Sequence, residues 1–174
     1  MTWFKIFSII ICFGFFNISH AQEVTLTDNQ SFTVTTGTTV DQIEGENTSG
    51  VTITVETGGV VIGFDALELS DSVDATVIIN GTIDSADGGV VGDGTPIYNN
   101  PPGLEESGDD AIVANDTTGL TVIVKDGALV LADDEFMNAD GATGATITIE
   151  EGARIFAEDQ GIDDVEASTI TING

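Results

Sequence analysis

The chain has 174 residues and a formal net charge of −27, from 30 Asp and Glu against three Lys and Arg. Beyond Ala21 it contains no His, Cys or Trp, and its basic residues there are Lys125 and Arg154. For that part of the chain, this composition excludes a Ser-His-Asp triad, a Cys nucleophile and an imidazole or thiolate zinc site. It also excludes nucleic acid as a direct partner, because phosphate contacts need clustered Lys and Arg.

Residues 1–21 have the pattern of a secretory signal peptide. Lys5 supplies a positive n-region, and an apolar run of eleven residues extends from Ile6 to Phe16. This run is too short to cross a bilayer as a helix. The small residues Ser19 and Ala21 predict cleavage after Ala21, and an uncleaved N-terminal anchor is the alternative. No later segment reaches the length of a membrane span, so we expect an exported protein, extracellular or on the outer-membrane surface.

Residues 22–49 follow the pattern of the later chain only weakly. Phe32-Thr33-Val34, with Val40 and Ile43, predicts an atypical first rung. Solenoids need terminal units of this kind to cover the end of the apolar column. We therefore expect this segment to cap the N-terminal end of a repeat array.

Residues 50–174 contain a repeat of about two dozen residues. A tetrapeptide of Thr and apolar residues recurs with spacings of 24, 45, 25 and 23, beginning at Thr52, Thr76, Thr121, Thr146 and Thr169. The spacing of 45 predicts one repeat plus an insertion of about 21 residues. Two further apolar segments follow each tetrapeptide after Gly, Asn or Asp turns. They alternate with period two and show no helical periodicity, which predicts short strands.

A repeat this short cannot bury its apolar face alone, whereas stacking equivalent strands buries a continuous column. We therefore predict an all-β parallel β-helix, a solenoid of about five rungs about 4.8 Å apart. One inward column is Ile53/Val77/Val122/Ile147/Ile170, and the next is Val55/Ile79/Val124/Ile149/Ile172. The first Thr of each tetrapeptide is predicted to lie in an outward ladder. A β-sandwich is the competing fold, but it does not explain why the motifs recur in fixed order.

The outward face of the predicted strands also contains apolar residues. Ile78 and Ile123 occupy outward positions on neighbouring rungs, as do Ile62, Leu131 and Phe156. Such patches mark a partner or a covering loop. The alternative is an error of one residue in the strand register, which would exchange the two faces.

The insertion, at about residues 90–108, contains all three prolines and the only Tyr of the chain. Loops that project from a rigid solenoid are common sites of binding. Tyr98, Asn99 and Asn100 are therefore the candidate binding loop, for a sugar or a protein. The alternative is a tolerated surface loop in which Tyr98 packs back on the solenoid.

Asp residues recur at equivalent positions of successive rungs. One set is Asp109, Asp134 and Asp159, with Asp110 beside it, and a second set is Asp71, Asp116, Asp140 and Asp164. Carboxylates stacked about 5 Å apart repel by roughly 1–3 kcal/mol, and a hard cation with oxygen ligands would reverse the sign. We expect no cofactor here, because Asp suits turns and the side chains splay into water. The alternative is bound Ca²⁺, with Asp109, Asp110, Asp134 and Asp159 as candidate ligands.

The repeats resemble those of bacterial autotransporter passenger domains, within the wider pectate-lyase-like right-handed parallel β-helix group. The resembling stretches are GVTITVETGGVVIGFDALEL (50–69), INGTIDSADGG (79–89) and ATITIEEGARIFAEDQGI (145–162). The resemblance implies a right-handed coil and a secreted, surface-displayed adhesin or stalk. The final segment, 169–174, matches 76–81 and then stops partway through a rung. We therefore expect a truncated array whose C-terminal end is closed by further rungs or by a partner.

These features predict a structural or adhesive module rather than an enzyme. Its partner would be a protein or a glycan on a host or neighbouring cell. The alternative is a carbohydrate-active β-helix enzyme, a polysaccharide lyase or hydrolase. Lyases of this group resemble one another in using Ca²⁺ with a basic residue as proton acceptor, and only Lys125 and Arg154 are available for that role. The high negative charge would also repel polyuronates.

Overall fold

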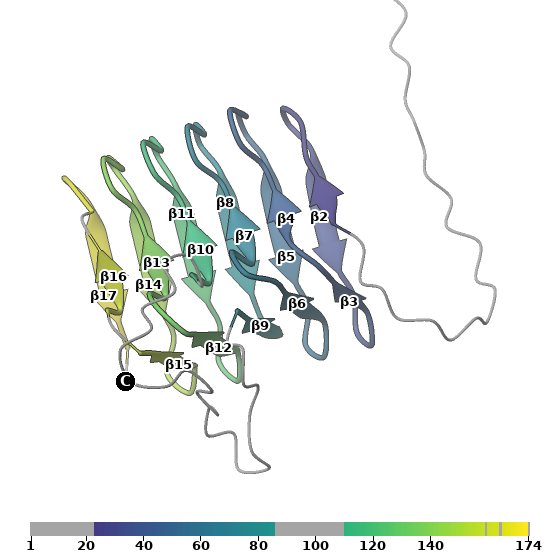
Figure 1. Cartoon of the computed structure of the whole chain (residues 1–174). Coiled ribbons are helices and arrows are strands. Elements are labelled where there is room, and N and C mark those ends of the chain that lie inside the picture. Colours follow the sequence, from purple (N-terminus) through teal and green to yellow (C-terminus); the bar gives the residue numbers. More distant parts are fainter. Residues whose placement is uncertain (1–22, 86–109, 159, 164, 174) are drawn as a thin grey trace, which may run out of the picture.

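The structure, a computed structural model, describes residues 23–85, 110–158, 160–163 and 165–173. These residues form an all-β parallel β-solenoid of about five turns. The turns lie side by side in one row, from the purple turn that contains β2 to the yellow strand β17 (Figure 1). The predicted solenoid is therefore confirmed, and the β-sandwich is excluded because every described strand pair is parallel.

Three sheets run along the solenoid, and a complete turn contributes one strand to each. Sheet 1 contains β1 (Val24–Thr25), β4 (Ile43–Glu44), β7 (Leu67–Glu68), β10 (Ile112–Val113), β13 (Met137–Asn138) and β16 (Ile162–Asp163). Sheet 2 contains β2 (Ser31–Val34), β5 (Thr52–Val55), β8 (Thr76–Ile79), β11 (Thr121–Val124), β14 (Thr146–Ile149) and β17 (Thr169–Ile172). Sheet 3 contains β3 (Thr39–Val40), β6 (Val60–Ile62), β9 (Thr82–Asp84), β12 (Leu129–Ala132) and β15 (Arg154–Ala157).

The register of sheet 2 follows the tetrapeptide repeat. Thr52 pairs with Thr76, Thr76 with Thr121, Thr121 with Thr146, and Thr146 with Thr169. Alternate residues of each strand therefore point to the same side of the sheet on every turn. The two predicted inward columns and the outward Thr ladder are confirmed.

The inward columns form the core, which is aliphatic and continuous. Ile53, Val77, Val122 and Ile147 are fully buried in one column, as are Val55, Ile79 and Val124 in the next. Burial decreases at the last described strand, where Ile170 is 47% exposed and Ile172 is 68% exposed. Each turn thus buries its apolar residues against the turn on either side of it, as expected for a repeat that cannot form a core alone.

Small residues occupy the corner between sheets 2 and 3. Gly59, Gly81, Ala128 and Ala153 are equivalent on successive turns, since the residues that follow them pair in register. A Cβ at Gly59 would lie 2.5 Å from the backbone oxygen of Val34, and a Cβ at Gly81 would meet the backbone oxygens of Glu56 and Gly59. The tight corner of the first turns therefore requires glycine.

The segment before residue 50 contributes strands to all three sheets. β2 pairs with β5, β3 with β6, and β4 with β7, while β1 pairs with β4 alone. Phe32 lies opposite Ile53, and Val34 is fully buried opposite Val55. The first rung is thus built like the later ones.

The insertion lies between β9 and β10. The chain takes 29 residues from Asp84 to Val113 and only seven between the equivalent positions Leu131 and Asn138. The extra residues all fall between these two strands, and the strands on both sides of the insertion keep their register. In the described part of the chain, no helix has the length and apolar character that a membrane crossing requires.

Candidate functional site

Two of the acidic residues proposed from the sequence as metal ligands, Asp110 and Asp134, belong to the described chain. Asp109 and Asp159 lie outside the described residues, as do Tyr98, Asn99 and Asn100 of the predicted binding loop. The structure therefore bears on the acidic residues at the corner that precedes sheet 1, and this corner is the candidate site.

Asp65, Asp110 and Glu135 are equivalent on three successive turns. Each residue stands two positions before the first residue of a sheet 1 strand: Leu67, Ile112 and Met137. The Asp65 Oδ1 atom accepts a hydrogen bond of 3.4 Å from the backbone N–H of Asp110. The Asp110 Oδ1 atom accepts one of 3.0 Å from the backbone N–H of Glu135. Each Asp carboxylate thus joins its own turn to the next at this corner.

Glu135 and Asp134 bring two further carboxyl groups to Asp110. One carboxylate oxygen from each of the three residues lies within 4.8 Å of the other two. Asp110 is 2% exposed and Glu135 is 7% exposed, while Asp134 is half-buried. We call Asp110, Asp134 and Glu135 the carboxyl cluster.

Glu135 was absent from the ligands proposed from the sequence, although a signal for it existed. The triplets Asp110-Ala111-Ile112 and Glu135-Phe136-Met137 align in the repeat, which already places the Glu135 side chain beside Asp110. A register defined by Asp residues alone omits Glu135, although this residue belongs to the same column.

Burial, together with a side-chain hydrogen bond with Asp110, raises the pKa of Glu135 to about 8. The charged groups that act on Glu135 are all acidic: Asp110, Asp134 and Asp163. Because two carboxylates cannot hydrogen-bond to each other without a proton, Glu135 donates to Asp110 near neutral pH. Burial likewise raises the pKa of Asp65 to about 6, although the hydrogen bond from the backbone N–H of Asp110 acts in the opposite direction.

The one ion pair found among the described residues lies elsewhere. Lys125 Nζ is 2.6 Å from Glu150 Oε1, on adjacent turns at the ends of β11 and β14. The hydrogen bond from Lys125 lowers the pKa of Glu150. Lys125 therefore neutralises the Glu150 carboxylate at the end of β14. In the carboxyl cluster, a bound proton neutralises the negative charge instead.

The chemistry of the carboxyl cluster follows from its burial. A proton shared between Asp110 and Glu135 relieves the repulsion and holds two turns together. A hard cation could use the same oxygens, but Ca²⁺ takes six to eight ligands and would have to displace the proton of Glu135. Hydrolysis of a glycoside would require carboxyl groups that reach the substrate, and Asp110 and Glu135 are almost fully covered.

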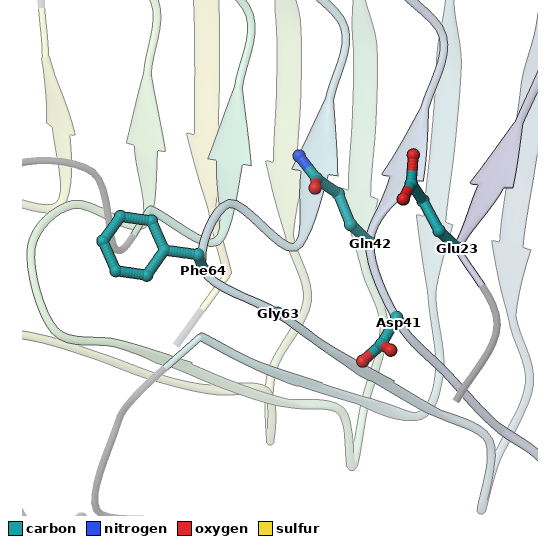
Figure 2. A pocket seen from close by; sticks show the side chains of 5 residues that line it. All are labelled: Glu23, Asp41, Gln42, Gly63 and Phe64. Carbon is teal, nitrogen blue, oxygen red and sulfur yellow. The ribbon is translucent and has the colours of Figure 1, made fainter. Parts of the chain in front are cut away.

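An open pocket of about 290 Å³ lies near the N-terminal end of the solenoid, lined by Glu23, Asp41, Gln42, Gly63 and Phe64. The ring of Phe64 is 52% exposed. Figure 2 shows that this ring points away from the side chains of Gln42 and Glu23. The lining groups do not converge on one point, which a specific small-molecule site requires.

The second predicted set of equivalent Asp residues is confirmed for Asp71 and Asp116, and it is wrong by one position at Asp140. Asp164 lies outside the described residues. Val113 pairs with Asn138 and Thr118 with Thr143, so Gly141 lies opposite Asp116. Asp140 lies opposite Asn115, whose Oδ1 atom accepts a hydrogen bond of 2.9 Å from the Asp140 N–H. Asp116 and Gly141 both have positive φ, at 54° and 73°. The shared backbone conformation thus sets this register, because Gly and Asp both tolerate the left-handed region.

Comparison with known proteins adds no relative: no protein-family model, no curated protein and no solved structure matches this chain.

Proposed function

We propose that this chain is an exported, surface-displayed module, structural or adhesive, of the autotransporter-passenger type with a right-handed coil. Three sheets that keep one register along the whole described solenoid carry this proposal. Such a stack is a rigid rod, because every turn is hydrogen-bonded and packed against its neighbours. A rod of this kind presents its side faces and loops at a distance from the point of attachment, which is what a stalk or adhesin requires.

The acidic composition and the lack of Cys beyond Ala21 agree with this role. A protein that folds without disulfides needs no oxidation step after export, and its stability depends on packing and hydrogen bonds. A high negative charge keeps it from self-association and from anionic surfaces. The proposed partners are a protein or a glycan on a host or neighbouring cell.

The last described turn supports a contact at that end of the solenoid. Ile170 and Ile172 continue the inward columns but are largely exposed, and the outer edge of β17 pairs with no strand among the described residues. An open parallel edge above an apolar column binds another strand readily. We expect a further rung or a partner to cover this end.

Export and display are tested together in a Gram-negative host. The full chain carries an epitope tag after Gly174, and the N-terminus of the exported product is determined by mass spectrometry. The expected product begins at Gln22 and is removed from intact cells by added protease. Ala21→Arg is the matched variant, because it blocks cleavage without changing the solenoid. A product that remains in the cytoplasm would contradict the proposal.

The alternative, a carbohydrate-active enzyme, has one observation in its favour. Glu135 retains a proton near neutral pH beside the carboxyl groups of Asp110 and Asp134, as a general acid would. Release of reducing sugars or unsaturated products from a polysaccharide panel tests it. Turnover that is lost in Glu135→Gln and kept in Glu151→Gln, an exposed control, would establish the enzyme.

A further inference from the structure

The outer face of sheet 2 differs from the rest of the surface. Two side chains of each strand point outward from this sheet, and all of them are Ser, Thr or Ile: Ser31, Thr33, Thr52, Thr54, Thr76, Ile78, Thr121, Ile123, Thr146, Thr148, Thr169 and Thr171. All twelve are half-buried or exposed. We call them the Thr face.

No charged residue lies on the Thr face, although the chain contains 30 Asp and Glu. The outward positions of the other two sheets do include acids: Glu44, Glu68 and Asp163 in sheet 1, and Asp84 in sheet 3. Charges return where the strands of sheet 2 end, at Glu56 and at the paired Lys125 and Glu150. The Thr face is therefore an uncharged strip on a chain of high net negative charge, which fits an uncharged partner.

The spacing of the Thr face is regular in two directions. Strands paired in register repeat about every 4.8 Å along the solenoid, and the two outward residues of a strand lie about 6.6 Å apart. In ice, tetrahedral hydrogen bonds of about 2.75 Å place second-neighbour oxygens about 4.5 Å apart, with a lattice repeat of about 7.3 Å along the hexagonal axis. The mismatch along the solenoid accumulates to only about 1.5 Å over the six strands of the sheet.

We propose that the Thr face binds ice, with the rows of hydroxyl and methyl groups matched to the water lattice. This inference goes beyond the proposed function, because it gives the module a second surface of attachment besides a protein or glycan partner. Each Thr hydroxyl donates to one water and accepts from another. The methyl groups of Thr and the side chains of Ile78 and Ile123 restrict the orientation of the waters next to them. Both effects order water before the face meets the crystal.

The size of the Thr face favours a solid over a protein partner. Six strands of four residues cover roughly 25 Å by 13 Å, on the order of 300 Å². A stable protein interface buries about 800 Å² on each partner, so neither a second copy nor another protein would be held by this face alone. Attachment to a crystal requires no comparable area, because the lattice is rigid and many modules attach to it.

The rigidity of sheet 2 supports the same partner. Its strands are hydrogen-bonded to neighbours on both sides from β5 to β14, and the residues beneath the outward positions are fully buried from Ile53 to Ile147. The rows of hydroxyl groups are therefore held in place before binding, so little conformational entropy is lost when the lattice forms on them.

The test measures how the full chain, purified after export, divides between liquid and ice grown slowly on a cold surface. Thr121→Lys places a charge at the centre of the Thr face. Thr82→Lys is the matched control, since Thr82 is a half-buried, outward Thr at the start of β9 in sheet 3. We expect the parent and Thr82→Lys to enter the ice, and Thr121→Lys to enter it about tenfold less, because an unpaired charge resists dehydration. Circular dichroism confirms that the variants are folded.

Three results would overturn the inference: exclusion of the folded parent from ice, an equal loss in Thr82→Lys, or dimers in solution that Thr121→Lys dissociates. Binding to crystalline cellulose or chitin in place of ice would also overturn it. A folded chain that is displayed on cells but excluded from ice leaves the proposed function intact. Ice binding by a chain that is never exported contradicts the proposed function alone.

Discussion

Asp110 and Glu135 stand at equivalent positions on adjacent turns, and the Asp110 Oδ1 atom accepts a 3.0 Å hydrogen bond from the Glu135 backbone N–H. The side chain of Glu135 also hydrogen-bonds to Asp110, and both residues are almost fully buried. An acidic chain thus stacks two carboxyl groups in its interior and holds them together with a proton. This arrangement makes the solenoid sensitive to pH.

We expect stability to fall as the pH rises from about 4.5 to about 8. The pKa of Glu135 in the folded chain is about 8, above its ordinary value of 4.5, so the folded state binds the proton more tightly than the unfolded state. The stabilisation is complete below pH 4.5 and is lost as the pH passes through 8. The loss is on the order of 2 kcal/mol, because solvent and salt moderate the effect of the shift. Thermal unfolding followed by circular dichroism at several pH values measures it.

Glu135→Gln should remove most of this pH dependence, because the amide donates to Asp110 at every pH. Glu151→Gln is the control, since Glu151 is an exposed turn residue. Equal slopes of melting temperature against pH in the parent and in Glu135→Gln would show that the carboxyl cluster does not act in this way.

Calcium should not stabilise the protein at pH 6. The carboxyl cluster offers three oxygens from Asp110, Asp134 and Glu135, and Glu135 is protonated at this pH. We expect CaCl₂ to raise the melting temperature no more than NaCl of equal ionic strength, through general screening of the net charge. Calorimetric titration is the direct measurement, and a saturable heat that disappears in Asp110→Asn would contradict this expectation.

Two positions of one inward column should differ sharply in their tolerance of Ala. Ile147 is fully buried, whereas its neighbour on the next turn, Ile170, is 47% exposed. Ile147→Ala should cost about 2–5 kcal/mol and Ile170→Ala less than about 1 kcal/mol. Urea unfolding of both variants measures the difference. Similar costs would indicate that the last strand is covered in solution, by a partner or by a further rung.

A side chain at Gly81 should destabilise the fold, because the corner between sheets 2 and 3 has no space for a Cβ atom there. A Cβ there would meet the backbone oxygens of Glu56 and Gly59, which belong to the adjacent turn and have little freedom to move. We expect Gly81→Ala to lower the unfolding free energy by about 1–3 kcal/mol. Gly161→Ala is the matched control, because a Cβ at Gly161 meets no atom within 4 Å. Equal urea midpoints for the two variants would be inconsistent with a tight corner at Gly81.

Most of the fold was predictable from local sequence. The tetrapeptides that begin at Thr52 and Thr76 are short, alternate with period two and recur at fixed spacing. Only stacking in register buries all their apolar residues at once, so period and polarity together determine the columns. The prediction failed at a turn: Asp140 was placed opposite Asp116, where the structure has Gly141. The two turns have the same length, but the position equivalent to Asp116 holds Gly, so a comparison of Asp with Asp selected the neighbouring residue.

The sequence by itself determined that the chain coils, which residues point inward in sheet 2, and that the Thr face is uncharged. These properties follow from repetition, because residues at the same place in each repeat experience the same surroundings. The repeat alignment places Glu135 beside Asp110, but only the tertiary structure decided that both side chains are buried and that Asp134 joins them. The direction of a side chain at a corner depends on the path of the backbone there and on the turn above it, and neither is encoded in a local pattern.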